Sequence, residues 1–402
     1  MRLPHERTGL PACFRKDDVR DRERPMTTFD FALAGGRVVD PSQGIDAVAD
    51  VAFQGSKIAA VGPGLAAQAR HSRDVTGHIV VPGLIDLHTH VYWGGTSLGV
   101  DPLRLARGGC TTLVDTGSAG PGNFAGFRAH IIEPCPVRII AYLNISFAGI
   151  YGFSKHVMVG ESGDQRLLSP VDAAEVASAN RDVLAGIKVR VGRNASGTAG
   201  LVPLDIAREV AERVGMKMMV HIDEPPPGLE EVLARMRPGD VLTHCFRAFP
   251  NSPARADGRV EPFVLAARQR GILFDIGHGM GSFAFATART MIANGFLPDS
   301  ISSDVHALCI DGPAFDLCTT LSKFLCLGVT LADVVRAATQ APAAALGRPD
   351  LGTFAAGSAG DATVLDLASG QFNYVDSTGE HLNGRQKLSA AGIVVGGRWF
   401  LP

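Results

Sequence analysis

The chain has 402 residues, of which 46% are hydrophobic, with 38 basic and 40 acidic side chains and a formal net charge of −2. This length exceeds one ordinary domain and matches a large barrel of roughly 250 residues plus a smaller attached domain. The charges are interspersed, so no basic stripe indicates a nucleic-acid or membrane partner. No run reaches the roughly 18 apolar residues of a membrane span. The expected partner is a small-molecule substrate, and self-association into a homo-oligomer stays open.

The cysteines and the N-terminus bear on the cellular compartment. Seven cysteines are spread along the chain without a CxxC pair, at positions 13, 110, 135, 245, 309, 318 and 326. This pattern favours buried, reduced thiols in a cytoplasmic protein. The first 25 residues carry mixed charges and lack the apolar core of a secretory signal. We interpret residues 1–25 as a disordered extension or as a start site assigned too early, with Met26 as the alternative beginning.

Short strand-like segments, separated by glycine and proline, occupy both flanks of the chain. They fall within residues 26–81 near the N-terminus and within residues 346–402 near the C-terminus. Closely punctuated strands of this kind are typical of a small β-sandwich. We therefore expect the two flanks to pair into one small β-sandwich domain, with the region between them forming a separate body.

Residues 82–345, between the flanks, alternate apolar runs with segments of helical spacing such as 204–214 and 229–236. Eight runs are apolar nearly throughout, as strands buried on both faces are. They lie at residues 80–88, 111–116, 137–145, 186–191, 217–222, 241–246, 272–276 and 300–305. Eight such alternations in series predict an α/β protein with a (β/α)8 TIM barrel, whose active site lies at the C-terminal ends of the strands.

Side chains that can bind metal ions stand at or near the ends of several of these runs. His88 and His90 are two residues apart on one run, and alternate residues of a strand point to the same face, so both can reach one ion. A pair of this kind alone is more often a buried structural pair. Its coincidence with candidates on four other runs predicts a metal centre; these are Lys188, His221, His244 and Asp304.

Lys188 has two interpretations. It can form an ion pair with a carboxylate at the strand end. Alternatively, its neutral amine can react with CO2 to give N6-carboxylysine, an anionic oxygen donor that bridges two cations. Burial lowers the pKa of a lysine and favours the neutral, reactive amine.

In order and spacing these residues resemble the binuclear amidohydrolase superfamily. The resemblance begins at Pro82-Gly-Leu-Ile-Asp-Leu-His88-Thr-His90, ends its ligand set at Ser303-Asp304, and covers the chain from about residue 30 to the C-terminus. It implies a centre of two Zn²⁺ ions, with other divalent ions as an alternative. The ligands it implies are His88, His90 and Asp304 for one ion, His221 and His244 for the other, and carboxylated Lys188 as the bridge.

Three segments resemble, more narrowly, the dihydroorotase-like deacetylases of this superfamily: His90-Val-Tyr-Trp-Gly-Gly, Gly186-Ile-Lys-Val-Arg and His221-Ile-Asp-Glu-Pro-Pro. This resemblance implies a zinc-dependent deacetylase or esterase for acetylated (R)-2-hydroxy acids of the acetyl-(R)-mandelate type, with N-acyl D-amino acids as further substrates. The expected reaction is attack by a metal-bridging hydroxide on the scissile carbonyl. Asp304 is the expected general base and then the proton donor to the leaving group.

Two other functions are weighed against this one. Dihydroorotases, which are cyclic amidases like the hydantoinases, carry an arginine two residues after the second histidine to hold the substrate carboxylate. Tyr92 stands at that position here, which disfavours a dihydroorotase. D-aminoacylases use a bridging cysteine where this chain offers Lys188. A non-catalytic structural homologue is disfavoured because the whole ligand set is present.

Three residues are candidates for substrate contact. Arg190 lies two residues beyond Lys188 on the same strand face, so it can clamp a carboxylate or form a structural salt bridge at the barrel rim. Tyr92 can donate a hydrogen bond to the substrate carbonyl or carboxylate. Ser282 ends the glycine-rich segment 277–282, which we expect to line or cover the pocket.

Overall fold

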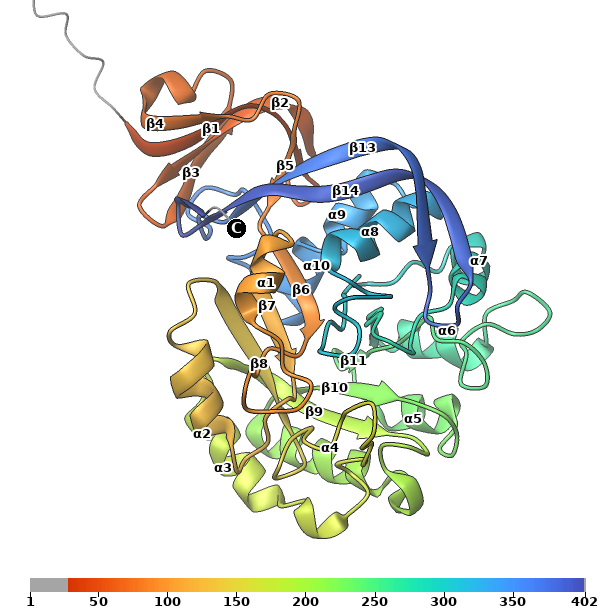
Figure 1. Ribbon diagram of the computed structural model, residues 1–402. Coiled ribbons are helices and arrows are strands. Elements are labelled where there is room, and N and C mark those ends of the chain that lie inside the picture. The colour runs from red at the N-terminus through yellow and green to blue at the C-terminus, as the bar shows by residue number, and fades with distance from the viewer. Residues whose placement is uncertain (1–27, 401–402) are drawn as a thin grey trace, which may run out of the picture.

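The computed structural model describes residues 28–400 and contains two sheets (Figure 1). The predicted extension at residues 1–25 lies outside the described residues. A seven-stranded parallel sheet occupies the middle of the sequence, and an eight-stranded sheet is built from its two flanks. Within the described part of the chain, no helix is both long enough and apolar enough to cross a membrane.

The parallel sheet has the strand order β12-β11-β10-β9-β8-β7-β6, so strands that follow one another in sequence are neighbours in space. Its strands are buried almost throughout, which explains why the sequence shows nearly continuous apolar runs. They are β6 (Leu84–Thr89), β7 (Cys110–Thr116), β8 (Arg138–Asn144), β9 (Leu184–Val191), β10 (Lys217–Ile222), β11 (Val241–Leu242) and β12 (Leu273–Phe274).

Residues 300–305 close this sheet into a barrel through single bridges. Ser300 pairs with Asp275 beside β12, and Val305 pairs with Thr89 of β6, both in parallel. The Asp304 backbone N–H also donates to the carbonyl oxygen of His88 at 2.7 Å. Asp304 has a positive φ of 47°, which interrupts regular strand geometry at this point. The eighth predicted strand therefore occupies its place in the barrel without a regular ladder.

Helices follow the strands and cover the outside of the barrel (Figure 1). α4 shows why they form where they do: Pro203 lies in its first turn, and Gly215, with φ 66°, ends it in the left-handed conformation. Its buried residues recur at helical spacing, at positions 204, 207, 210, 211 and 214. The helices are α1 (Pro102–Arg107), α2 (Phe124–Phe127), α3 (Pro170–Ala179), α4 (Val202–Val214), α5 (Leu229–Arg235), α6 (Pro262–Gln269), α7 (Phe285–Ala293), α8 (Leu317–Cys326), α9 (Leu331–Arg336) and α10 (Gln340–Ala345).

The second sheet joins the two ends of the chain. Strand β5 pairs in parallel with β1 and antiparallel with β13, so it connects the N-terminal strands to the C-terminal ones. A separate apolar cluster, which includes Phe53 and Phe354, is formed mainly by side chains of this sheet. Packing into two layers, as in a sandwich, stays a prediction. The strands are β1 (Phe29–Asp40), β2 (Ile45–Gln54), β3 (Lys57–Gly62), β4 (Ala69–Asp74), β5 (Ile79–Pro82), β13 (Ala362–Val375), β14 (His381–Val395) and β15 (Arg398–Phe400).

The apolar run at residues 80–88, predicted as one barrel strand, is divided between the two sheets. β5 ends at Pro82, and β6 begins at Leu84. The chain turns from one sheet to the other at Gly83, where a Cβ atom would lie 2.2 Å from the Thr111 hydroxyl oxygen and 2.7 Å from Asp361 Cβ. Only glycine fits this crossing. The run looks continuous in the sequence because both strands are buried.

The hairpin of β13 and β14 is much longer than the sequence indicated, and it arches over the barrel toward α7 (Figure 1). Its turn binds the segment after β12: the Ser377 N–H donates to Phe283 O at 3.1 Å, and the Phe283 N–H donates to the Ser377 hydroxyl at 2.9 Å. Asp376, which is 2% exposed, accepts the Phe285 N–H at 2.8 Å. The small sheet therefore supports the C-terminal side of the barrel.

We predict that Asp376→Ala lowers the free energy of unfolding by about 2 to 4 kcal/mol, because it leaves the buried Phe285 N–H without an acceptor and frees the turn. Urea denaturation measures this loss. The matched control is Asp366→Ala, since the Asp366 side chain is 54% exposed and pairs only with His78 among the described residues. Its expected effect is below about 0.5 kcal/mol. Equal losses in both variants would contradict the role assigned to the turn.

Candidate metal centre

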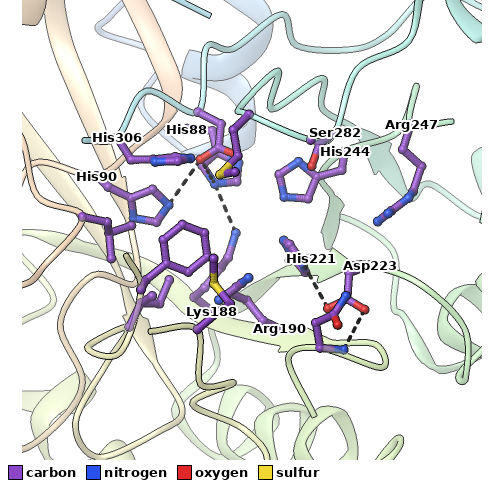
Figure 2. A pocket seen from close by; sticks show the side chains of 18 of the residues that line it. His88, His90, Lys188, Arg190, His221, Asp223, His244, Arg247, Ser282 and His306 are labelled. Carbon is purple, nitrogen blue, oxygen red and sulfur yellow. Dashed lines mark hydrogen bonds and ion pairs between the residues drawn. The ribbon is translucent and has the colours of Figure 1, made fainter. Parts of the chain in front are cut away.

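A cavity of about 280 Å³ opens at the C-terminal ends of the barrel strands (Figure 2). Its wall contains all six side chains that the sequence singled out as metal ligands. They come from different elements, some from strands and others from the residues directly after them, so only barrel closure brings them together. The six are His88, His90, Lys188, His221, His244 and Asp304.

The donor atoms of these side chains lie close to one another. His88 Nε2 and His90 Nε2 are each 3.3 Å from the same Asp304 oxygen, Oδ1. Lys188 Nζ is 3.5 Å from His88 Nε2. The rings of His221 and His244 have centroids 4.4 Å apart, and those of His88 and His244 are 5.2 Å apart. One ligand atom each from His88, His244 and Asp304 falls within a mutual distance of 4.8 Å.

The outer ring nitrogen of His88 is held in a defined tautomer. The Thr243 hydroxyl donates to Asp275 Oδ2 at 2.7 Å, so its oxygen is left to accept a hydrogen bond. His88 Nδ1 lies 2.8 Å from that oxygen and is therefore the protonated nitrogen. Nε2, the nitrogen that faces the cavity, then carries a lone pair. Outer partners of this kind orient metal-binding histidines.

His244 and His90 are anchored in comparable ways. His244 Nδ1 donates to the carbonyl oxygen of Gly277 at 2.8 Å, which leaves a lone pair on its Nε2. His90 Nδ1 lies 2.8 Å from the Ser118 hydroxyl, and the Ser118 backbone N–H donates to the Asp115 carboxyl at 2.9 Å. In each case the ring is fixed from outside the cavity, and the inner nitrogen faces the other candidate ligands.

His221 contributes a buried polar atom that forms no hydrogen bond within residues 28–400. Its Nε2 is buried and has no hydrogen-bond partner among the described residues; the nearby Asp223 Oδ2 is 3.9 Å away. A buried nitrogen without a partner costs free energy that a ligand to that nitrogen restores. Asp223 itself is held by the backbone N–H groups of Asn194 and Ala195.

Burial sets the charge state of the cavity. It lowers the pKa of the four imidazoles, so they are neutral at physiological pH and their lone pairs are available. Burial also lowers the pKa of the Lys188 amine and raises the pKa of the Asp304 carboxyl. The lysine shift favours the neutral amine that reaction with CO2 requires. All of these groups are at most 9% exposed.

Backbone strain concentrates at the same place. His244 and Asp304 have positive φ angles of 66° and 47°, a backbone conformation that residues other than glycine rarely adopt. Two glycines allow the side chains to approach. A Cβ at Gly279 would lie 2.3 Å from Asp304 Oδ2, and one at Gly117 would lie 2.7 Å from Lys188 Cγ. The fold tolerates strain where the candidate ligands have to converge.

The supporting residues were missed by the sequence reasoning. Thr243, Asp275 and Ser118 are buried polar groups at the ends of apolar strands, and each holds an imidazole directly or through one other residue. Asp86 belongs to the same class: its carboxylate accepts hydrogen bonds from the backbone N–H and hydroxyl of Ser303, next to Asp304. A carboxylate inside an otherwise apolar run, as at Asp275, was the available signal.

The three predicted substrate contacts have different outcomes. Ser282 lines the cavity. Arg190 also lines it, but its Nη1 donates to Glu161 Oε2 at 3.0 Å, and Glu161 is buried. Tyr92 is not among the lining residues: its ring packs on Phe127 at 4.7 Å between centroids, and its hydroxyl donates to Asn123 O at 3.3 Å. These contacts direct the Tyr92 side chain toward Phe127 and Asn123, and a substrate hydrogen bond from Tyr92 stays a prediction.

Comparisons with known proteins agree with this fold and site. The model of the amidohydrolase family matches residues 284–399. A deacetylase of Agrobacterium fabrum is 38% identical over 326 residues, which are 81% of this chain and 79% of that protein. A crystal structure of a dihydroorotase has a TM-score of 0.83 at 36% identity and covers 92% of this chain and 98% of its own. A crystal structure of an adenine deaminase has a TM-score of 0.86 at 28% identity, with coverages of 92% and 99%.

A barrel with this cavity, together with a relative that is 38% identical over most of its length, defines a hydrolase that acts on ester or amide bonds. The chain belongs to the amidohydrolase family.

We predict that Gly277→Ala destabilises the protein more than an ordinary substitution at positive φ. A Cβ at Gly277 would lie 2.4 Å from Thr243 Oγ1 and 2.8 Å from His244 Nδ1. The control is Gly295→Ala, because Gly295 has φ 71° but open space around it. Thermal and urea unfolding should show an extra loss of about 1 to 3 kcal/mol for Gly277→Ala. Identical losses would mean that Thr243 and His244 are not packed against this backbone.

Proposed function

We propose that this protein is a zinc-dependent deacetylase or esterase for acetylated (R)-2-hydroxy acids of the acetyl-(R)-mandelate type, with N-acyl D-amino acids as further substrates. The observation that carries the proposal is the convergence of the six candidate ligands in one cavity of a chain that is 38% identical to a deacetylase. The cavity also offers an apolar wall for the substituent of such an acid, formed by Leu98, Ile150, Phe153, Met158 and Met280.

The residues present fit two divalent ions. The donor set combines neutral imidazoles, a carboxylate and a lysine with a lowered pKa, and the orphaned His221 Nε2 needs a partner. In this proposal His88, His90 and Asp304 would hold one ion, His221 and His244 would hold the other, and N6-carboxylated Lys188 would supply an anionic ligand to both. Imidazole and carboxylate ligands suit zinc. When bound, the ions supply a water nucleophile activated at neutral pH and a polarised substrate carbonyl.

Asp304 moves the proton in this proposal. Its carboxylate accepts the proton released as water attacks the acyl carbon, and then donates it to the leaving oxygen or nitrogen as that bond breaks. Its position suits the task, because the backbone N–H of Asp304 is fixed to His88 O and its side chain reaches the cavity. An alkoxide leaves more easily than an amine, so esters should react faster than the matching amides.

The second candidate function is a cyclic amidase. It is favoured by the dihydroorotase structure that is 36% identical to this chain. The position of Tyr92 speaks against it, because the residue that would have to hold the substrate carboxylate there packs on Phe127 outside the cavity. We rank deacetylation first for this reason.

We also propose the cytoplasm as the compartment of the reaction. Six cysteines within residues 28–400 are free thiols, among them the buried Cys110, Cys245 and Cys309. Unpaired thiols of this number are typical of a reducing compartment.

We predict that the zinc-loaded protein hydrolyses acetyl-(R)-mandelate faster than N-acetyl-D-phenylglycine, and both faster than dihydroorotate or hydantoin. In Asp304→Asn, kcat should fall by at least about 10²-fold, because general acid–base catalysis contributes about that much or more. Metal content is measured on the same samples, so a loss of turnover can be separated from a loss of metal. Preference for a cyclic imide would overturn the deacetylase proposal, and wild-type turnover by Asp304→Asn with intact metal would overturn the role of Asp304.

We predict that Thr243→Val weakens zinc binding by roughly 10- to 100-fold, because His88 loses the hydroxyl that fixes its tautomer. Competition with a chromogenic chelator measures the affinity without any assay of activity. Thr243→Ser is the matched control, since it keeps the hydroxyl and should retain zinc nearly as well as the wild type. Equal affinities in the valine variant and the wild type would show that this support does not act on the metal.

A further inference from the structure

Arg247 is a cavity residue that the reaction described above does not use. It follows His244 by three residues, in the segment after β11, and it lines the cavity. Figure 2 shows it on the side of His221 and His244, with its guanidinium group turned inward near Asp223. The residue is only 8% exposed, although arginine is rarely buried without a partner.

The hydrogen bonds of Arg247 are incomplete. Its Nη1 donates to the carbonyl oxygen of Ile222, while its Nε is buried without a hydrogen-bond partner in the described part of the chain. Among the described residues 28–400, Arg247 forms no ion pair with a carboxylate. Burial lowers the pKa of Arg247, but a guanidinium keeps its proton in a protein. The cavity therefore contains a buried cation with donor capacity to spare.

The neighbouring carboxylates do not fill this capacity. Asp223 attracts the guanidinium at longer range, but its two oxygens accept the backbone N–H groups of Asn194 and Ala195 at 3.2 and 2.9 Å. Glu224 is half-exposed and lies near Arg193, at 3.8 Å. Neither carboxylate forms a direct ion pair with Arg247, so an anion that enters the cavity would be the first to do so.

Arg190, the other arginine of the cavity wall, differs from Arg247 in its charge partners. Arg190 was the sequence-based candidate for a carboxylate clamp, yet it already has a buried anion beside it, since Nη1 is 3.0 Å from Glu161 Oε2. Its guanidinium also lies over the Phe153 ring, 5.4 Å from the centroid. A buried carboxylate therefore balances the charge of Arg190, whereas within residues 28–400 no carboxylate forms an ion pair with Arg247.

We propose that Arg247 is the specificity-determining residue that binds the carboxylate of the substrate. This deepens the proposed function and rests on it for the identity of the substrate as an acylated hydroxy acid or amino acid. A carboxylate that accepts hydrogen bonds from the guanidinium satisfies the orphaned donor and neutralises the buried cation. The acid group is thereby held on the side of His221 and His244. In this proposal the Arg247 side chain makes the enzyme prefer substrates that carry a carboxylate next to the acylated oxygen or nitrogen.

The test compares a charged substrate with its neutral analogue. Acetyl-(R)-mandelate and acetyl-(R)-mandelamide differ in the carboxylate alone. We expect Arg247→Met to lower kcat/KM for the acid by roughly 10- to 100-fold, mostly through KM, because a hydrogen bond to a charged group is lost. The amide should change less than threefold. Arg247→Lys should recover part of the preference for the acid, because it restores the charge without the planar fork.

A surface control excludes a general effect of removing an arginine. Arg259→Met removes a guanidinium whose side chain is 70% exposed and paired with Asp257, and it should leave both substrates unaffected. Far-ultraviolet circular dichroism and metal content are compared across all variants. A Met variant at position 247 that keeps the wild-type preference for the acid, with equal metal content, overturns the proposal.

A binding measurement separates this proposal from the proposed function. Calorimetric titration with (R)-mandelate and with (R)-mandelamide requires no turnover, and the comparison at equal metal content removes the contribution of the ions. A preference for mandelate that disappears in Arg247→Met supports the carboxylate site even if the wild type deacetylates nothing. Deacetylation by the wild type together with an unchanged preference in Arg247→Met would leave the proposed function standing and overturn this inference.

Discussion

The candidate site depends on burying four imidazoles in their neutral form with one ring nitrogen directed into the cavity. An imidazole in such a place has to satisfy its other nitrogen, and Thr243, Ser118 and the carbonyl oxygen of Gly277 do this for three of the rings. Burial removes the proton that would block the inner nitrogen. The same desolvation acts on Lys188, in the direction that favours a neutral amine. Burial thus prepares the four imidazoles and the lysine amine together.

The imidazoles keep these positions because hydrogen bonds from outside the barrel support the segment that holds His244. The segment 277–285 carries Gly277, whose carbonyl holds His244, and Phe283, which is bonded to the turn of the β13–β14 hairpin. Buried Lys323 adds a second tie: its Nζ donates to Val375 O at 2.9 Å and lies 2.7 Å from His278 Nε2. The small sheet therefore does more than pair the two flanks of the chain. Its β13–β14 hairpin fixes the segment that contains Gly277, whose carbonyl oxygen accepts the hydrogen bond of His244.

Much of the barrel was predictable because burial on both faces leaves a strong mark on a sequence. The runs at 111–116, 137–145 and 217–222 match β7, β8 and β10 closely, and β10 has the predicted bounds. The run at 80–88 was wrongly predicted as one strand, because buried strands of two different sheets give the same apolar pattern. Only the close approach of the backbone at Gly83 separates β5 from β6. The outer part of the β13–β14 hairpin was missed because it is largely exposed and shows little alternation.

The sequence by itself determined which side chains can serve as ligands and that they stand at strand ends, because residue type and strand periodicity are local properties. It could not decide which polar groups are already satisfied. Tyr92 and Arg190 are candidates for substrate contact in the sequence, and Arg247 is not. In the structure Tyr92 packs on Phe127 and Arg190 is paired with buried Glu161, whereas Arg247 keeps a buried nitrogen without a hydrogen-bond partner within residues 28–400. Those differences arise from contacts between residues far apart in the chain, and only the tertiary structure sets them.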